Sequence, residues 1–305
     1  MVASNISAPH FHDTNKAREY LEALRWPYGP VCPHCGGTER NILLKGKSTR
    51  CGLYKCGDCR EQFTVTVGTL FERSKVPLEK WLMAVYLMSA SKKAISSHQL
   101  HRMLGVTYKT AWFMTHRIRE AMKDPVFTGK LGTGGGTVEV DETFWGNKKP
   151  KGQKEGRGYH HKEKIFSLVE RGGKVRSFHV PAVNAKTLRP IMQEQIDAAA
   201  NVITDEAAQY CLSKPPTKDL FASHEYVRHG AGEYVRGKIH TNTIESYFSI
   251  LKRGLVGTYH HVSKQHLKRY IGEFDFRYNN RHVSDVQRAD LALIGISGKR
   301  LFYRD

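Results

Sequence analysis

Two pairs of cysteines near the N-terminus have the residue type and spacing of metal ligands. Both pairs are Cys-x-x-Cys, and 20 residues separate them: Cys32 with Cys35, and Cys56 with Cys59. Each such turn directs two thiolates to one point, and Zn²⁺ binds four thiolates in a tetrahedron with bonds of about 2.3 Å. Four thiolates leave no open coordination position, so we expect a structural zinc ion rather than a catalytic one. The alternative is four free thiols; the unpaired Cys51 and Cys211 are expected to be small hydrophobic residues.

Two aspartates stand at positions that suit metal-dependent chemistry. Asp141 lies within an apolar strand expected over 137–145, where alternation places it on the same face as Glu139. Asp205 comes directly after a strand expected over 201–204, at the carboxyl end, where open α/β sheets keep their sites. Mixed-sheet nucleases and strand-transfer enzymes hold catalytic carboxylates at such positions.

A third carboxylate, Glu245, lies on a helix expected over 242–253. Lys252 follows two helical turns later, so both side chains project from one face. Three clustered carboxylates repel one another unless a cation holds them. Two divalent ions about 3.5–4 Å apart would do so, and would activate water and stabilise a leaving 3′ oxygen. The alternative is a set of scattered surface acids, because the chain has 29 acidic residues.

Composition bounds the class of protein. The chain has 305 residues, 40% of them hydrophobic, which is enough for one or two buried cores. Lys and Arg number 48 against 29 Asp and Glu, and the net charge of +19 indicates a polyanionic partner, most often nucleic acid. No apolar run reaches about 18 residues and no secretory signal is seen, so we expect a soluble, intracellular protein without a membrane span.

The region from Pro77 to Met122 has helical spacing of apolar residues. A helix over 97–104, a break at Gly105 and a further helix from Thr107 predict a helix-turn-helix. Its last helix presents polar and aromatic residues away from the apolar face, and these are the candidates for phosphate and base contacts: Tyr108, Lys109, Thr110, Phe113 and Arg117. The alternative is an ordinary three-helix packing.

The second half of the chain alternates strands with helices, which indicates a mixed-sheet α/β domain. Its elements include a hairpin of 164–171 with 174–181, and helices over 186–199 and 263–280. We expect the following organisation: an N-terminal helix in 1–28, a zinc ribbon in 29–70 that ends in a strand over 62–67, a helix-turn-helix domain in 71–128, a Gly-rich linker in 129–136, the α/β domain in 137–282 and a C-terminal tail in 283–305.

Basic stretches flank the three acids. Residues 147–164 hold seven Lys and Arg against two Glu, directly after the strand of Asp141, and we expect Lys148, Lys149 and Lys151 to contact DNA. The alternative is a solvated charge run. Further candidates for phosphate contacts are Arg253, Arg269, Arg277 and Arg281. Three histidines, His240, His260 and His261, are expected to be structural or to contact DNA.

Several segments together resemble one known family, the bacterial insertion-sequence transposases that carry a zinc ribbon. The similar segments are residues 22–35, 56–69, 138–146, 204–210, 240–245, 252–261 and 276–281. The resemblance covers almost the whole chain, and the combination of segments is more specific than any one of them.

This resemblance implies a ribonuclease H-like catalytic domain of the DDE type, with Asp141, Asp205 and Glu245 as the triad and Lys252 as the accompanying basic residue. The resemblance also implies an alternative, because some relatives carry Asn at the third place, and Asn242 is available one helical turn before Glu245. The spacing of Glu245 and Lys252 favours the glutamate. Glu142 and Glu206 are expected to be structural. Three carboxylates form a hard oxygen site, which indicates two Mg²⁺ ions, or Mn²⁺ in their place.

The partners implied are the DNA ends of the element and target DNA, bound by a homodimer or larger assembly without a membrane. Two other classes stay open from the sequence. One is a DNA-binding regulator whose catalytic domain is silent, and the other is a nuclease of the same fold without strand transfer. The presence of all three acids and Lys252 counts against the regulator.

Overall fold

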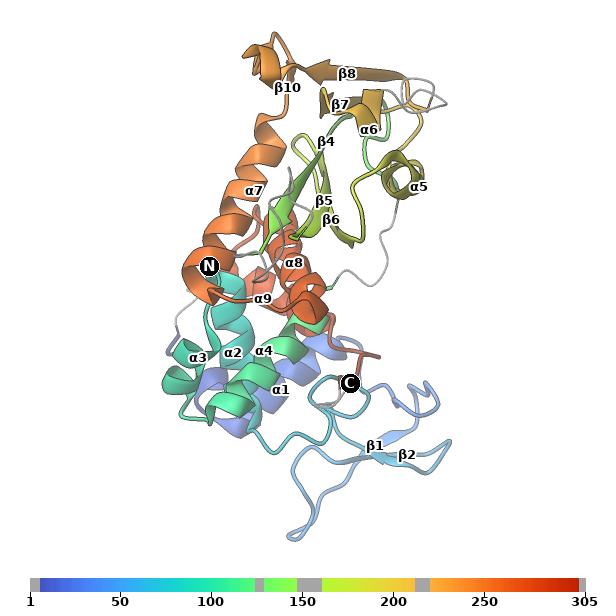
Figure 1. Ribbon diagram of the computed structural model, residues 1–305. Helices are drawn as coiled ribbons and strands as arrows, with labels where there is room; N and C mark the ends of the chain where they lie inside the picture. Colours follow the sequence, from blue (N-terminus) through green and yellow to red (C-terminus); the bar gives the residue numbers. More distant parts are fainter. Residues whose placement is uncertain (1–5, 124–128, 147–160, 212–219, 302–305) are drawn as a thin grey trace. The chain divides into compact units, whose positions relative to one another are not determined.

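The computed structural model describes residues 6–123, 129–146, 161–211 and 220–301, apart from the side chain of Cys211 (Figure 1). The chain divides into two compact units: unit 1 is Met1–Pro125 with Asn280–Asp305, and unit 2 is Val126–Asn279. Lys148, Lys149 and Lys151, which we expected to contact DNA, lie outside the described residues. No helix in the described part of the chain is long and apolar enough to span a membrane.

Unit 1 is built from helices with well-defined N-caps. The helices are η1 (Pro9–Phe11), α1 (Thr14–Arg25), α2 (Leu78–Ala90), α3 (Ser97–Leu104), α4 (Tyr108–Met122) and α9 (Asp285–Ile294). The side chains of Asp13, Ser96 and Thr107 each accept a hydrogen bond from the main chain of the first turn that they cap. Between α3 and α4, Gly105 has φ of 59°, so the chain reverses there and produces the expected helix-turn-helix shape.

The last part of the chain belongs to unit 1. Residues 283–305 were expected to be a tail, and the structure forms α9 there, with a capping box in which Ser284 and Gln287 bond each other's main-chain N–H. Helix α9 packs against α1, α2 and α4.

The cysteine-rich part of unit 1 carries a small antiparallel sheet of β1 (Asn41–Leu43), β2 (Tyr54–Cys56) and β3 (Gln62–Phe63). The strand expected over 62–67 is wrong beyond Phe63. The main-chain N–H of Val67 bonds to the carbonyl of Thr64, and the hydroxyl of Thr69 donates to the carbonyl of Thr66. These local bonds form turns where alternation alone predicted a strand.

Unit 2 contains a five-stranded mixed sheet. Its strands are β4 (Thr137–Trp145), β5 (Glu163–Glu170), β6 (Val175–Val180), β7 (Asn201–Asp205) and β8 (Ser223–Val227), in the order β6-β5-β4-β7-β8. The pairs β4–β5 and β5–β6 are antiparallel, and β4–β7 and β7–β8 are parallel. With helices on both faces, this is the predicted ribonuclease H-like α/β fold (Figure 1).

The two faces of β4 contact different helices. Val138 and Val140 belong to the hydrophobic core beneath α5 (Ala185–Gln195), whereas Glu139 faces α7 (Asn242–Gly254). Helix α8 (Lys264–Asn279) covers the same face as α7, over β6 (Figure 1). Smaller elements complete the unit: α6 (Ala208–Cys211), η3 (His229–Ala231), the hairpin of β9 (Val235–Arg236) and β10 (Ile239–His240), and η4 (Leu255–Tyr259), which is π-helical.

Residues 129–136, expected as a flexible linker, carry one side chain of the core. Leu131 is buried, forms a bridge with Ile196 and exchanges main-chain hydrogen bonds with Gln195 and Asp197. These bonds attach the segment to the end of α5 and to the approach to β7. The helix expected over 186–199 accordingly ends at Gln195, because the residues that follow pair with Leu131.

Candidate zinc site and candidate active site

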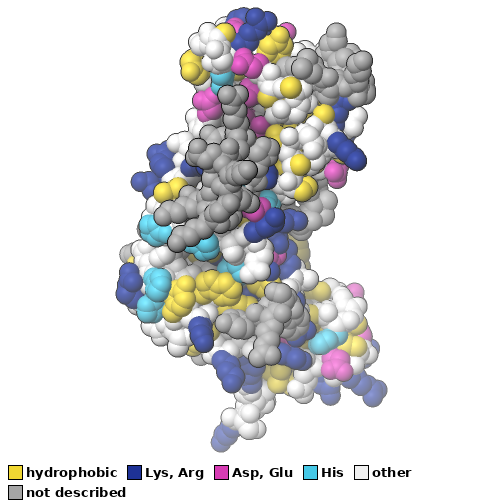
Figure 2. Space-filling view, in the orientation of Figure 1, with side chains coloured by type: hydrophobic (Ala, Val, Ile, Leu, Met, Phe, Trp, Pro, Cys, Tyr) yellow, Lys and Arg dark blue, Asp and Glu magenta, His cyan; other side chains and the backbone are white. Residues whose placement is uncertain are grey.

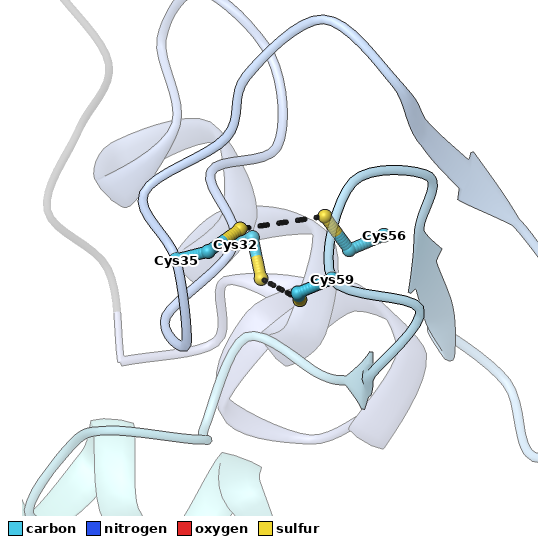
Figure 3. Close-up of side chains that lie close together, drawn as sticks. All are labelled: Cys32, Cys35, Cys56 and Cys59. Atoms are coloured by element: carbon cyan, nitrogen blue, oxygen red, sulfur yellow. Dashed lines mark hydrogen bonds between the residues drawn. The ribbon is translucent and has the colours of Figure 1, made fainter.

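The four predicted cysteines converge on one point (Figure 3). Their Sγ atoms all lie within 4.8 Å of one another, and the separations of Cys32 from Cys59 and of Cys35 from Cys56 are both 3.6 Å. A tetrahedron with Zn–S bonds of 2.3 Å has sulfur separations of about 3.8 Å, so the arrangement fits a structural zinc ion. In the metal-free cluster, the main-chain N–H of Cys59 is the largest of several influences that lower the pKa of the Cys56 thiol to about 7, whereas the pKa of the Cys59 thiol is raised to about 12, so Cys56 ionises before Cys59.

Asp141 and Asp205 lie on neighbouring parallel strands of unit 2, because Glu139 of β4 pairs with Ile203 of β7. Asp141 Oδ1 accepts a hydrogen bond from the main-chain N–H of Glu142 at 2.7 Å, and Asp205 Oδ1 accepts one from Ala207 at 3.0 Å. Burial, followed by the charges of Glu142, Asp205 and Glu245, raises the pKa of Asp141 to about 8. Burial also raises the pKa of Asp205. The two aspartates therefore share a region of negative potential.

Glu245 lies in the first turn of α7, and 48% of its side chain is exposed. Its Oε1 accepts a hydrogen bond from the hydroxyl of Thr241 at 3.0 Å. Glu139, two residues before Asp141 on β4, accepts hydrogen bonds from the main chain of Thr243 and Ile244, which brings the first turn of α7 and Glu245 close to the first aspartate. Lys252 and Arg253 are exposed further along the same helix. The structure thus brings the three predicted acids to one end of the sheet.

Glu139 joins the strand of Asp141 to the helix of Glu245. Its side chain is fully buried, and its Oε2 accepts hydrogen bonds from the main-chain N–H groups of Thr243 and Ile244 at 2.8 and 2.9 Å. Its Oε1 accepts from the hydroxyl of Thr243 at 2.8 Å and from Arg171 Nε at 2.6 Å. A carboxylate at this place satisfies free N–H groups of the first helical turn and stabilises the helix dipole. Glu139 therefore fixes where α7 begins.

Sequence reasoning did not find His229. Its Nε2 lies 3.9 Å from Glu245 Oε1 and 3.5 Å from the hydroxyl of Thr241, and its charge acts on the pKa of Asp205. The imidazole therefore lies near the second and third acids. His229 lies on η3, directly after β8, and the fold brings it close to Glu245. No spacing in the sequence relates the two residues.

The two other acids of this region have structural partners. Glu142 accepts hydrogen bonds from the amide of Gln209 and the hydroxyl of the buried Tyr210, both on α6. Glu206 Oε1 accepts the main-chain N–H of Gly230 at 2.9 Å. These contacts attach α6 to β4 next to Asp141, and η3 to the residue that follows β7.

The chemistry of the acidic donors fits a hard divalent cation. Within the described residues, the four cysteines form the one group of three or more metal-ligating side chains whose ligand atoms all lie within 4.8 Å. The three acids are spaced more widely than that. Burial is the largest cause of the raised pKa of Asp141, and the charges of Glu142, Asp205 and Glu245 add to it; a cation bound here would offset those charges. Carboxylate oxygens are the ligands that Mg²⁺ and Mn²⁺ prefer.

The candidate DNA contacts differ in their surroundings. Lys109 is exposed on α4. Arg117 is half-buried, donates to the main-chain carbonyl of Leu70 at 2.7 Å and stacks on Phe113. Arg277 is buried and ion-paired with the buried Glu273, so the expectation that it contacts phosphate is wrong. His240 Nδ1 accepts from Arg171 at 3.1 Å, which gives that histidine a structural partner.

Comparison with known proteins confirms the family. Residues 134–279 match the ISXO2-like transposase domain, and residues 12–62 match the transposase zinc-ribbon domain. A Halobacterium salinarum protein described as an uncharacterized protein in transposable element ISH50 is 31% identical over 282 residues, which cover 88% of this chain and 91% of the relative. The chain therefore belongs to the ISXO2-like transposases and carries their zinc ribbon.

Proposed function

We propose that this transposase cleaves DNA at the ends of its own insertion sequence and joins the freed ends to target DNA. The observation that carries the proposal is the meeting of Asp141, Asp205 and Glu245 at one end of a ribonuclease H-like sheet. The residues of the catalytic step are Asp141, Asp205 and Glu245 with Lys252. Hydrolysis of a phosphodiester releases a 3′-hydroxyl at each end. This hydroxyl then attacks a phosphodiester of the target in line, forms a new P–O bond and displaces the target strand's own 3′ oxygen.

The acids would hold two Mg²⁺ ions, or Mn²⁺ in their place, which supply activation of water and stabilisation of the leaving 3′ oxygen. Asp141 and Asp205 each direct carboxylate oxygens from a rigid strand, and Thr241 orients Glu245 through its hydroxyl. Lys252 extends from the exposed side of α7, where its ammonium neutralises a phosphate next to the scissile bond.

Recognition of the element ends belongs to unit 1 in this proposal. The zinc ribbon and the helix-turn-helix present Lys109 and the beginning of α4 to DNA, and the net charge of +19 attracts the phosphate backbone. Arg253 on α7 and Lys148, Lys149 and Lys151 contact the backbone near the acids. Both ends must be processed together, so the active form is a homodimer or larger assembly on cytoplasmic, nucleoid DNA.

A cleavage and strand-transfer assay tests the proposal. The protein is incubated in Mg²⁺ with a DNA fragment that spans the gene and its native flanks, beside the Asp141→Asn and Asp197→Asn variants. Asp197 precedes β7, at the opposite end of that strand from Asp205, and bonds the main-chain N–H of Ala199. Joined products from wild type and Asp197→Asn alone support a transposase, nicks without joining indicate a nuclease, and binding without nicking indicates a silent regulator.

A further inference from the structure

An exposed arm lies directly beside the acidic site. This arm, residues 228–240, comprises η3, β9 and β10 and connects β8 to α7. Its large hydrophobic side chains are turned to solvent: Tyr234 is 60% exposed and Val235 is 52% exposed. Figure 2 shows hydrophobic and basic side chains next to one another at this end of unit 2. Because Tyr234 and Val235 are consecutive in the chain, the arm presents an apolar pair to solvent.

The base of the arm is bound firmly to the elements that carry the acids. On one side, the main-chain N–H of Gly230 donates to Glu206, the residue after Asp205, at 2.9 Å. On the other side, Arg171 donates to the carbonyls of Lys238 and His240 at 2.7 and 2.8 Å, while it also bonds Glu139. The arm therefore keeps a fixed position relative to Asp205 and the first turn of α7.

The side chain of His229 lies close to both Tyr234 and the acidic residue Glu245. The ring of Tyr234 packs on the imidazole of His229, with ring centroids 5.1 Å apart and planes inclined by 38°. The same imidazole lies 3.9 Å from Glu245 through its Nε2. The tyrosine is therefore separated from Glu245 by one imidazole, which places its ring close to a DNA strand whose phosphate is bound at Glu245.

The charges of the arm suit a nucleic-acid strand. Arg228, Arg236 and Lys238 outnumber Glu233, and Arg236 is ion-paired with Glu225 and Glu233, which leaves Arg228 and Lys238 for phosphates. Arg228 makes its contacts to Tyr226, whose ring it faces at 5.7 Å. Proteins hold unpaired bases by combining exposed aromatic rings with cations that contact the backbone, because every base has a face that stacks.

We propose that Tyr234 stacks on a base of the DNA strand that enters the acidic site, next to the scissile phosphate, while Arg228 and Lys238 contact the adjoining phosphates. This inference rests on the proposed function, since it assumes that the acids act on DNA. In this proposal, the arm positions the DNA strand before it is cleaved. The phenol oxygen is not required, so phenylalanine can replace tyrosine in this role.

The test uses the full-length protein and a duplex of the element end with 2-aminopurine at the terminal nucleotides. Fluorescence is read in Ca²⁺, so that stacking is measured separately from cleavage. We expect the 2-aminopurine fluorescence to be quenched by wild type and by Tyr234→Phe but not by Tyr234→Ala. The Tyr234→Ala variant should also cleave roughly tenfold or more slowly in Mg²⁺. Tyr28→Ala removes a tyrosine of unit 1 that is fully exposed, whereas Tyr234 is 60% exposed, and is the control for loss of an aromatic side chain.

Equal quenching by wild type and Tyr234→Ala, or no quenching by wild type at any terminal position, overturns the proposal. So does a Tyr234→Phe variant that behaves like Tyr234→Ala. The proposed function fails in a different way: it is contradicted if wild type never cleaves in Mg²⁺ or Mn²⁺, whatever the fluorescence shows. Circular dichroism of each variant confirms that the fold is retained. Val235→Ala changes the neighbouring side chain on the same arm, and shows whether quenching or cleavage is lost through unfolding of the arm.

Discussion

The carboxylate of Glu139 accepts a hydrogen bond from the main-chain N–H of Ile244 at 2.9 Å, and this bond joins the strand of the first predicted catalytic residue to the helix of the third. Glu139 precedes Asp141 by two residues on the same face of β4, and Ile244 immediately precedes Glu245 on α7. Arg171, the residue directly after β5, forms an ion pair with Glu139 and balances its buried charge. The distance between Asp141 and Glu245 therefore depends on a buried polar cluster that contains neither residue.

Replacement of Glu139 by alanine should destabilise the protein strongly. The change leaves the N–H groups of Thr243 and Ile244 and the Nε of Arg171 without their acceptor, and breaking a buried ion pair from one side costs about 3–5 kcal/mol. Urea unfolding gives the free energy, and hydrogen exchange of the segment 242–254 locates the loss. Glu225→Gln breaks an exposed pair with Arg236 and should change stability by less than about 1 kcal/mol. Equal effects of the two changes would contradict this account.

The third acidic position can be assigned by comparing Glu245 with Asn242. Both are exposed in the first turn of α7, but only Glu245 contributes a charge that raises the pKa of Asp141. We expect Glu245→Gln to reduce cleavage by at least about 100-fold and Asn242→Ala by less than about tenfold. Cleavage rates in saturating Mg²⁺, with DNA binding measured in parallel, decide the matter. The reverse ranking would transfer the third ligand position to Asn242.

The protonation of Asp141 should make the metal-free protein less stable as the pH rises. Its pKa in the folded state is raised to about 8, so between about pH 4 and pH 8 the folded state binds a proton that the unfolded state has lost. Folding is therefore opposed increasingly across this window. Asp141→Asn removes the effect, and the variant should exceed wild type in stability at about pH 8 by at least about 1 kcal/mol, with little difference near pH 4.

Urea unfolding at several pH values, in zinc-containing buffer without Mg²⁺, measures the difference. Added Mg²⁺ must displace the proton of Asp141, so its apparent affinity for wild type should rise with pH and level off above about pH 8. A stability difference between Asp141→Asn and wild type that does not change with pH would show that the carboxyl is already ionised at neutral pH.

Much of the fold was readable from local patterns. The alternation in 137–145 and the Gly172-Gly173 turn correctly predicted β4, β5 and β6. Helical spacing correctly predicted α7 and α8. Errors arose where a contact distant in sequence decides the local structure. The pairing of Leu131 with Ile196 ends α5 early, and the turn bonds of Thr64 and Thr69 end β3. The Ser284 and Gln287 capping box was a local signal of α9 that sequence reasoning overlooked.

The site was predictable only in part, for a physical reason. Alternation identified Asp141 within an apolar strand, and position at the carboxyl end of a strand identified Asp205. Residues that act through three-dimensional packing leave no such pattern: His229 reaches Glu245 from a different element, and Arg171 reaches Glu139 from the end of β5. The expectation that Arg277 contacts phosphate was wrong because its guanidinium forms a buried ion pair with Glu273, one helical turn earlier, and does not extend into solvent.

The zinc site permits a test with a control inside the same segment. Zn²⁺ bound by four thiolates contributes to folding directly, so Cys56→Ser should lose the metal and destabilise β1, β2 and β3. Cys51→Ser changes an exposed cysteine outside the cluster of four and should retain one zinc per chain. Elemental analysis of the purified variants measures the metal, and hydrogen exchange of residues 29–70 measures the loss of structure. Because unit 2 has its own core, its exchange should be unchanged in Cys56→Ser; zinc retained by that variant would mean that three thiolates and a fourth ligand suffice.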